Sequence, residues 1–325
     1  MRRRTIVTWG LTTTAAAGLG VGFGAVGLAD VTRLQRKEAR LYRLAAQHGG
    51  DMLWRAATDV AQEGYLMLER GSFGPSVGRQ LLMVSARLQI FAGWLASDAG
   101  HHDIAQSCNE GALTLSRQAN DPEIESQALA DLARSSYVLD RPREAQRLAT
   151  AAGDVATSAG VSAHLAAIPQ LRHAVASSLM ADTRGAAQAI KQARTMLDRA
   201  REEPAEEWCA SVTPFGIDGV EATCAINLGD AARASRLLDK VVSGYGSRSR
   251  RNRALYAVRL ARARVDNREV QGAAEAASAV LDDLSGDVAS WQVSSELSTV
   301  ARRLADHSQV EGVSQFLDRY QAISS

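Results

Sequence analysis

The sequence predicts an all-α protein built from short antiparallel helices. From Asp30 onward, apolar residues recur at steps of three and four, and almost no stretch alternates as a β-strand would. Gly, Asp, Asn or Pro interrupts this pattern roughly every 12–20 residues, which is the spacing of helix ends. Alanine is abundant, prolines number only 6, and aromatic residues make up 5% of the chain, a balance typical of closely packed helices.

Residues 1–29 differ from the rest. The arginines at positions 2–4 precede a stretch without a single charge, 5–29, which ends in small residues. This order resembles a secretory signal, and the paired arginines resemble a twin-arginine export signal, with Ile6 and Val7 where that signal prefers Phe and Leu. The stretch is also long enough to span or contact a membrane. A leader that is retained, with the protein in the cytoplasm, is the third interpretation.

The remaining residues, 30–325, form one predicted α-solenoid. Helices are expected over 31–70, before the first of five similar units, and over 76–98, which runs into that unit. Each unit has an apolar helix, a short polar turn and a second helix that begins with a small residue. The units lie near 86–119, 126–159, 167–200, 215–248 and 253–286. The small residues after the turns are Ala105, Ala145, Ala186, Ala234 and Gly272.

These units resemble the tetratricopeptide repeat, a helix–turn–helix of 34 residues that stacks into a right-handed superhelix. Counted from Ala86, the residues Gly93, Gly100, Ala105 and Ala112 fall at offsets 8, 15, 20 and 27. Small residues there let helices approach closely, and glycine at offset 15 tolerates the positive φ that ends a helix. Later units depart from this pattern, with Asp140 and Asn267 expected at the place of Gly100.

Two segments outside the units complete the prediction. The stretch 201–219 is the least repeat-like and is expected to contain the longest internal loop. Residues 290–321 are expected to form a last pair of helices that caps the stack, because terminal units need a polar outer face.

Most of residues 80–325 also resembles the repeat region of actinobacterial Xre-type transcriptional regulators. The matching pieces are GWLA at 93–96 with Asp98 and Gly100, LDRPREA at 139–145, and CAINLGD at 224–230. In those regulators a helix-turn-helix domain often precedes the repeats, but residues 1–29 contain no candidate for one. The resemblance therefore implies a sensor module without its DNA reader.

No catalytic site is expected, and the protein is interpreted as a non-enzyme without cofactor or metal. Adjacent histidines His101 and His102 diverge, and Cys108 lies in the next helix, so an exposed turn is favoured over a zinc site. The acidic run 202–207 lacks a partner that would separate the pKa values of its carboxylates. The cysteines, including Cys209 and Cys224, lack a neighbouring histidine and are expected to be buried thiols.

Direct nucleic-acid binding is disfavoured by the overall charge, since 37 Lys and Arg residues face 36 Asp and Glu residues. The best local candidate is the basic stretch 247–253. Its arginines are Arg248, Arg250, Arg251 and Arg253. Aromatic residues do not interleave them, so a solvated helix entry is favoured over a phosphate-binding patch.

A ligand groove on the concave side of the superhelix is the leading functional hypothesis. The first helix of each unit would line it, and the candidates there are Trp94, Arg134, Tyr137, Thr223 and Arg264. The Lys and Asn set of a carboxylate-clamp repeat protein is not recognisable. The expected partner is a peptide or protein, with a second copy of the chain left open, and the expected role is a regulatory scaffold. The alternative is a transcriptional regulator or cofactor that contacts DNA through 247–253.

Overall fold

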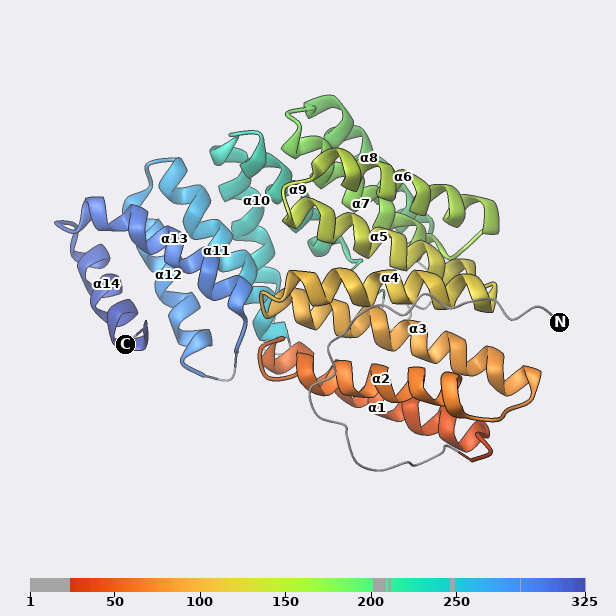
Figure 1. Ribbon diagram of the computed structural model, residues 1–325. Helices are drawn as coiled ribbons and strands as arrows, with labels where there is room; N and C mark the ends of the chain where they lie inside the picture. The colour runs from red at the N-terminus through yellow and green to blue at the C-terminus, as the bar shows by residue number, and fades with distance from the viewer. Residues whose placement is uncertain (1–23, 201–208, 210–211, 246–248, 287, 325) are drawn as a thin grey trace.

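The computed structural model consists of helices that follow one another in a curved stack (Figure 1). It describes residues 24–200, 209, 212–245, 249–286 and 288–324. These residues form fourteen α-helices and a short 3₁₀ turn, with one isolated bridge between Ala25 and Ser72. The prediction of an all-α, solenoid-like fold is therefore confirmed.

Three helices open the described chain: α1 (Leu28–His48), α2 (Trp54–Arg70) and α3 (Pro75–Asp98). The backbone N–H of Val26 donates to the carbonyl of Ser72 at 2.9 Å, and the Val26 side chain is buried against this first group of helices. The Asp30 carboxylate accepts the N–H of Gly27 at 2.9 Å and so secures the start of α1. The last residues of the uncharged stretch therefore pack on the helices.

Five helical hairpins, the first of which begins with α3, overlap the ranges of the five predicted units. The first consists of α3 and α4 (His102–Ala119). The others are α5 (Pro122–Val138) with α6 (Pro142–Ala159), α7 (Ala163–Leu179) with α8 (Thr183–Arg199), α9 (Pro214–Asn227) with α10 (Ala231–Gly244), and α11 (Arg250–Asp266) with α12 (Val270–Leu284).

One turn design recurs in all five hairpins. A residue with positive φ ends each first helix, and a buried alanine follows five positions later in the second helix. The residues with positive φ are Gly100, Asp140, Ala181, Gly229 and Arg268. The alanines are Ala105, Ala145, Ala186, Ala234 and Ala273.

The last hairpin corrects two sequence expectations by one residue each. Arg268, with φ of 64°, takes the turn position expected for Asn267, whose φ is −87°. The fully buried small residue is accordingly Ala273, whereas Gly272 is partly exposed beside the stem of Arg264. The expectation followed from aligning Gly272 with the small residues of the other units, which placed Asn267 five positions earlier at the turn.

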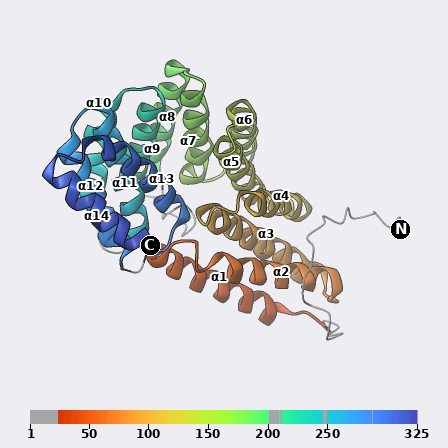
Figure 2. The same ribbon diagram turned by 60° about the vertical axis from the view of Figure 1, so that its left-hand side comes forward.

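The hairpins form two layers. The first helices, α3, α5, α7, α9 and α11, each contact the next member of this series and form the inner layer. The second helices pack on their own hairpin partner and on the first helix that follows. Figure 2 shows the resulting curve, with the first helices toward its inside. The inner layer therefore offers the concave face on which the predicted groove residues would lie.

A pair of helices, α13 (Trp291–Leu304) and α14 (Glu311–Ser324), follows the last hairpin, with the 3₁₀ turn Ala305–His307 between them. Phe316 and Val313 of α14 are fully buried in the last core cluster, so α14 covers the end of the stack. The predicted capping pair is present, and its second helix extends beyond the expected end at residue 321.

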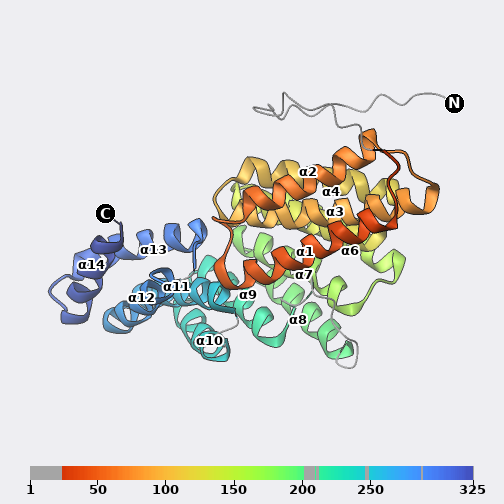
Figure 3. The ribbon, with the colours of Figure 1, turned by 90° about the horizontal axis from the view of Figure 1, so that it is seen from below.

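The curve of the stack brings its two ends together. The N–H of Ala289 donates to the carbonyl of His48 at 2.7 Å, and the N–H of Asp51 donates back to the carbonyl of Ala289 at 3.2 Å. In the view from below, the end of α1 lies next to α11 (Figure 3). The segment after α1 and the segment before α13 are therefore neighbours, although most of the chain separates them.

Candidate functional site

A buried carboxylate stands where the two ends of the stack meet. Asp98, the last residue of α3, is 1% exposed, and Arg251, in the first turn of α11, is 6% exposed. The Arg251 guanidinium pairs with Asp98 Oδ1 through Nη2 and through Nε at 3.1 Å. The Ser290 hydroxyl also donates to Oδ1 at 2.7 Å, and the Gly50 N–H donates to Oδ2 at 2.8 Å. We call the residues Gly50, Asp98, Arg251 and Ser290 the clasp.

Two glycines allow the chain to approach Asp98 this closely. A Cβ atom on Gly50 would lie 2.6 Å from the carbonyl oxygen of Leu95 and 2.8 Å from the Cβ of Asp98. Gly49 has φ of +82°, and a Cβ there would lie 2.5 Å from the carbonyl oxygen of Ala289. A side chain at position 50 would push the segment after α1 away from α3, and one at position 49 would push it away from Ala289.

Trp94, the first predicted groove residue, supports the clasp. The Arg251 guanidinium lies 5.5 Å from the centre of the Trp94 ring, and this ring stacks on Phe91 at 5.8 Å. Arg251 also donates to the Gln292 amide oxygen at 2.9 Å. The partly buried Trp94 side chain is thus engaged by neighbours within the fold.

Arg134 and Tyr137 lie on α5, one helix further along the inner layer, and Arg172 of α7 joins them. Asp131 accepts hydrogen bonds from Arg172 Nη2 at 3.2 Å and from Gln127 Nε2 at 2.7 Å. Arg134 Nη1 donates to the Ser97 hydroxyl at 3.2 Å, which ties α5 to α3. Burial opposes the charge of Arg172, but Tyr137 and Asp131 raise its pKa above the ordinary value.

Thr223 of α9 is part of a second polar group on the inner layer. Its hydroxyl accepts a hydrogen bond from Arg259 Nη1 at 3.1 Å. The same guanidinium forms a two-bond pair with the Glu296 carboxylate of α13, with Nε and Nη2 at 3.2 and 3.1 Å from its oxygens. The pair connects α9, α11 and α13 through side chains.

Tyr256 of α11 lies between these groups. Burial raises its pKa, and the nearby cations Arg259, Arg251 and Arg172 oppose this increase. Its ring stacks on Tyr245 at 5.6 Å and rests on α9 at Gly219, where a Cβ atom would lie 2.4 Å from the ring. The inner face therefore carries a cluster of arginines and tyrosines contributed by three or more helices.

Sequence reasoning missed four of these residues, and a register signal could have identified three. Asp131, Arg172 and Arg259 each precede the positive-φ residue of their own hairpin by nine positions. Counting back from the turns would have placed them on one line of the inner face. Tyr256 lies outside this register, and its position becomes visible only through its contact with Gly219.

Arg264 does not join this cluster. Its Nη2 pairs with Asp239 of α10 at 2.7 Å, and its Nη1 donates to the Gly272 carbonyl at 2.8 Å. It lies only four positions before its turn residue Arg268, which places it on a different side of α11 from Arg259.

The basic stretch 247–253 is largely used inside the fold. Arg250 and Arg253 both pair with the buried Asp283, and Arg251 belongs to the clasp. Arg248 lies outside the described residues. The expected solvated helix entry is wrong for Arg251, which is buried against Asp98 of α3. Arg250 and Arg253 stay about one-third exposed and pair with Asp283 of the partner helix α12.

The turn at His101 and His102 is partly covered, which corrects the expectation of an exposed turn. The His101 ring lies 4.3 Å from the Trp54 ring, and the His102 ring lies 5.5 Å from the Trp291 ring. The closing of the chain places Trp291 over this turn. Within the described residues, no three or more His, Cys, Asp or Glu side chains gather in a group that could hold a metal ion.

The prediction of three buried thiols is confirmed. Cys108, Cys209 and Cys224 are buried and take part in no disulfide within the described residues. Burial raises the pKa of the Cys108 thiol to about 12 and that of the Cys224 thiol to about 11, so both are poor nucleophiles. The acidic run 202–207 lies outside the described residues.

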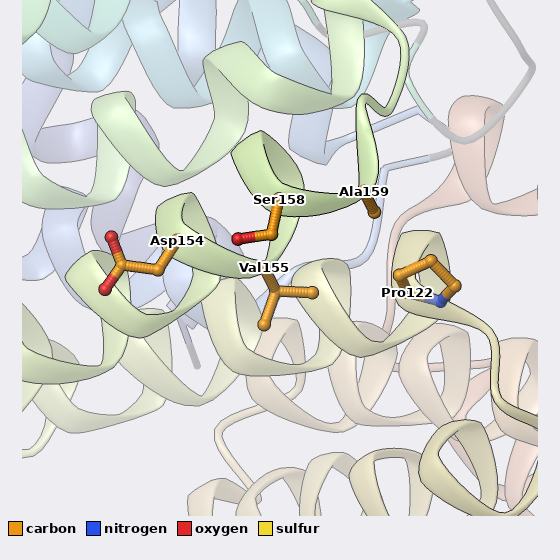
Figure 4. A pocket seen from close by; sticks show the side chains of 5 residues that line it. All are labelled: Pro122, Asp154, Val155, Ser158 and Ala159. Carbon is orange, nitrogen blue, oxygen red and sulfur yellow. The ribbon is translucent and has the colours of Figure 1, made fainter.

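A surface depression between the start of α5 and the end of α6 is drawn in Figure 4. It is lined by Pro122, Asp154, Val155, Ser158 and Ala159. The only ionisable group there is Asp154, so this depression lacks the converging polar groups that a catalytic or cofactor site requires. The polar cluster of the inner face remains the strongest candidate site.

None of the described helices combines the length and the apolar character needed to cross a bilayer, and most of residues 1–29 lie outside the described part. No protein-family model and no curated protein sequence matches this chain.

Proposed function

We propose that the protein is a non-enzymatic helical-repeat scaffold whose inner face binds a peptide or protein partner. The observation that supports this function best is the cluster of Arg134, Tyr137, Arg172, Tyr256 and Arg259 on the inner layer. Arg and Tyr are the residue types that most often anchor protein interfaces. Stacked helical hairpins provide a concave surface suited to an extended peptide or a helix.

Helix packing alone does not call for these side chains. The hairpins are held together mainly by alanine, leucine and valine, many of them fully buried. Guanidinium groups placed among such residues lose hydration, which is unfavourable unless partners replace it. Several charged groups on one face of the inner layer are therefore better explained by recognition than by stability.

The regulatory part of the proposal rests on the resemblance to the repeat region of actinobacterial Xre-type regulators. The DNA-binding alternative draws less support, because Arg250, Arg251 and Arg253 pair with Asp283 and Asp98. Retention on a DNA column at low salt, lost as salt increases, would revive that alternative.

Affinity capture from the cells that produce the protein tests the proposal. We expect a discrete partner that the wild-type chain retains and that Arg134→Gln/Tyr137→Ala recovers at least about tenfold less well, as expected for losing interface anchors. The matched control is Arg143→Gln/Arg147→Ala, which changes two exposed residues of the outer helix α6. Circular dichroism serves to check that both variants fold. Equal recovery of the partner by both variants would contradict the proposal.

A further inference from the structure

One edge of the Arg134 guanidinium has no hydrogen-bond partner. Nε and Nη2 are both buried and make no hydrogen bond, while Nη1 donates to Ser97. In a guanidinium, the Nε–H and the N–H of Nη2 lie on one side and point in parallel. This edge matches the two oxygens of a carboxylate through two parallel hydrogen bonds.

Asp131 is the nearest carboxylate, and it does not fill this edge. Its Oδ1 lies 3.7 Å from Arg134 Nε, beyond hydrogen-bond distance. The carboxylate instead accepts from Arg172 Nη2 and from Gln127 Nε2. Arg172 Nε is likewise buried without a hydrogen-bond partner. Two guanidinium groups therefore share one carboxylate and leave one positive charge unmatched.

The other arginines of the inner face are matched. Arg251 is paired with Asp98, and Arg259 is paired with Glu296. The excess charge is thus local to Arg134 and Arg172. Their side chains are 12% and 22% exposed, but the Nε and Nη2 atoms of Arg134 and the Nε atom of Arg172 are covered, so a ligand group reaches them only when the neighbouring side chains shift. His102 also lies near Arg134, and burial followed by this neighbouring charge lowers the pKa of its imidazole.

We propose that Arg134 and Arg172 bind a single carboxylate group of the peptide partner. This carboxylate accepts hydrogen bonds from Nε and Nη2 of Arg134 and from Nε of Arg172. This inference rests on the proposed function and names the chemistry of its ligand. A carboxylate carries one negative charge, which equals the local excess, whereas a phosphate monoester carries nearly two at neutral pH. The sequence excludes only the carboxylate clamp that is built from Lys and Asn. Here guanidinium groups supply the hydrogen-bond donors.

Side-chain NMR of the full-length protein tests the site directly. The ¹⁵N–¹H signal of Arg134 Nε, assigned through Arg134→Lys, is followed at constant ionic strength. N-acetylglycine presents a terminal carboxylate, and the α-amide of N-acetylaspartate presents a side-chain carboxylate. We expect one of them to shift the signal in a saturable manner, with a dissociation constant on the order of millimolar. The compound that binds more tightly shows whether the bound carboxylate is a chain terminus or an acidic side chain.

The protein provides an internal control in Arg264. Its Nε is also buried without a hydrogen bond, but both Nη atoms are engaged by Asp239 and Gly272, so its signal should not move. Arg134→Lys keeps the charge and removes the two-bond edge. Read from the Arg172 Nε signal, which remains in this variant, carboxylate binding should weaken about tenfold, while Arg264→Lys leaves binding unchanged.

Three results would overturn the inference: no saturable shift with either carboxylate, an equal shift with the neutral N-acetylglycinamide, or tighter binding of inorganic phosphate. The first would mean that solvent or Asp131 occupies the free edge. A partner captured through the inner face together with a negative titration would remove the carboxylate inference and leave the proposed function standing. Failure of the capture experiment would instead remove the proposed function.

Discussion

Asp98 and Arg251 form a buried ion pair between residues 153 positions apart in the chain. The Asp98 carboxylate also accepts from Ser290 and Gly50, so one side chain joins the end of α3 to α11, to the start of α13 and to the segment after α1. Stacks of helical repeats are held mainly by contacts between neighbouring repeats. The clasp adds a long-range connection, and we expect it to fix the curvature of the inner face.

Substituting Asp98→Asn tests the clasp. The change leaves the buried Arg251 guanidinium without its counter-charge, and breaking a buried pair in this way costs about 3–5 kcal/mol. We expect the free energy of unfolding, measured by urea denaturation, to fall by that amount. The control is Glu125→Gln, which breaks the pair with Arg117, a side chain 58% exposed, and should cost only about 0–1 kcal/mol. Equal losses in both variants would show that the clasp contributes no more than a surface pair.

The turn at Gly100 should be intolerant of a side chain. Gly100 has φ of +81°, and a Cβ atom would lie 2.6 Å from the Trp291 ring. Gly100→Ala therefore combines backbone strain with displacement of Trp291, and we expect a loss of about 2–4 kcal/mol in thermal or urea unfolding.

Gly160→Ala is the matched control for the turn. Gly160 has φ of +62° and open space where the Cβ atom would stand. This variant should lose stability only through backbone strain, about 1 kcal/mol. If both variants lost the same stability, the contact between Gly100 and Trp291 would not be part of the folded state.

The cysteines should be unreactive in the folded protein. Because burial raises the pKa of Cys108 to about 12 and of Cys224 to about 11, the thiolate fraction at pH 8 is small. We expect iodoacetamide to modify neither residue until denaturant is added, as read by mass spectrometry. The same shifts predict that stability declines as pH rises above about 9, where the thiols ionise more readily in the unfolded chain. Rapid modification of Cys108 at neutral pH would argue for a functional thiol.

Acidification should destabilise the fold partly through His102. Burial, and then the charge of Arg134, lowers the pKa of this imidazole below 6.5. The folded state favours neutral His102, so stability is lost as pH falls below the pKa of the unfolded chain. We expect the unfolding midpoint to drop between pH 7 and about pH 5.5, and to drop less in His102→Gln than in the wild type or in His307→Gln. His173, whose pKa burial also lowers, accounts for a residual drop.

The local parts of the fold could be predicted from the sequence. Helical periodicity and small residues such as Ala105 and Ala145 identified all five hairpins, because these signals act within a few turns of helix. The last turn was misplaced by one residue, since Gly272 rather than Ala273 was aligned with the small residues of the other units and Arg268 adopts the positive φ.

The long-range parts could not be predicted. Nothing near Asp98 in the sequence indicates Arg251 or Ser290, because the contact depends on the curvature accumulated over several repeats. Trp94 could therefore be assigned to the inner side but not to its contact with Arg251. Arg172 and Arg259 required the exact turn positions before their shared register could be seen.

The most direct test of the proposed binding face is site-specific photo-crosslinking in the cells that produce the protein. A photoreactive amino acid replaces Tyr137 on the inner face or Arg147 on the exposed face of α6. We predict that position 137 yields a discrete crosslinked partner, that position 147 does not, and that Arg134→Gln removes the crosslink from position 137. Crosslinking of the same partner from position 147 alone would place binding on the outer helices and contradict the account.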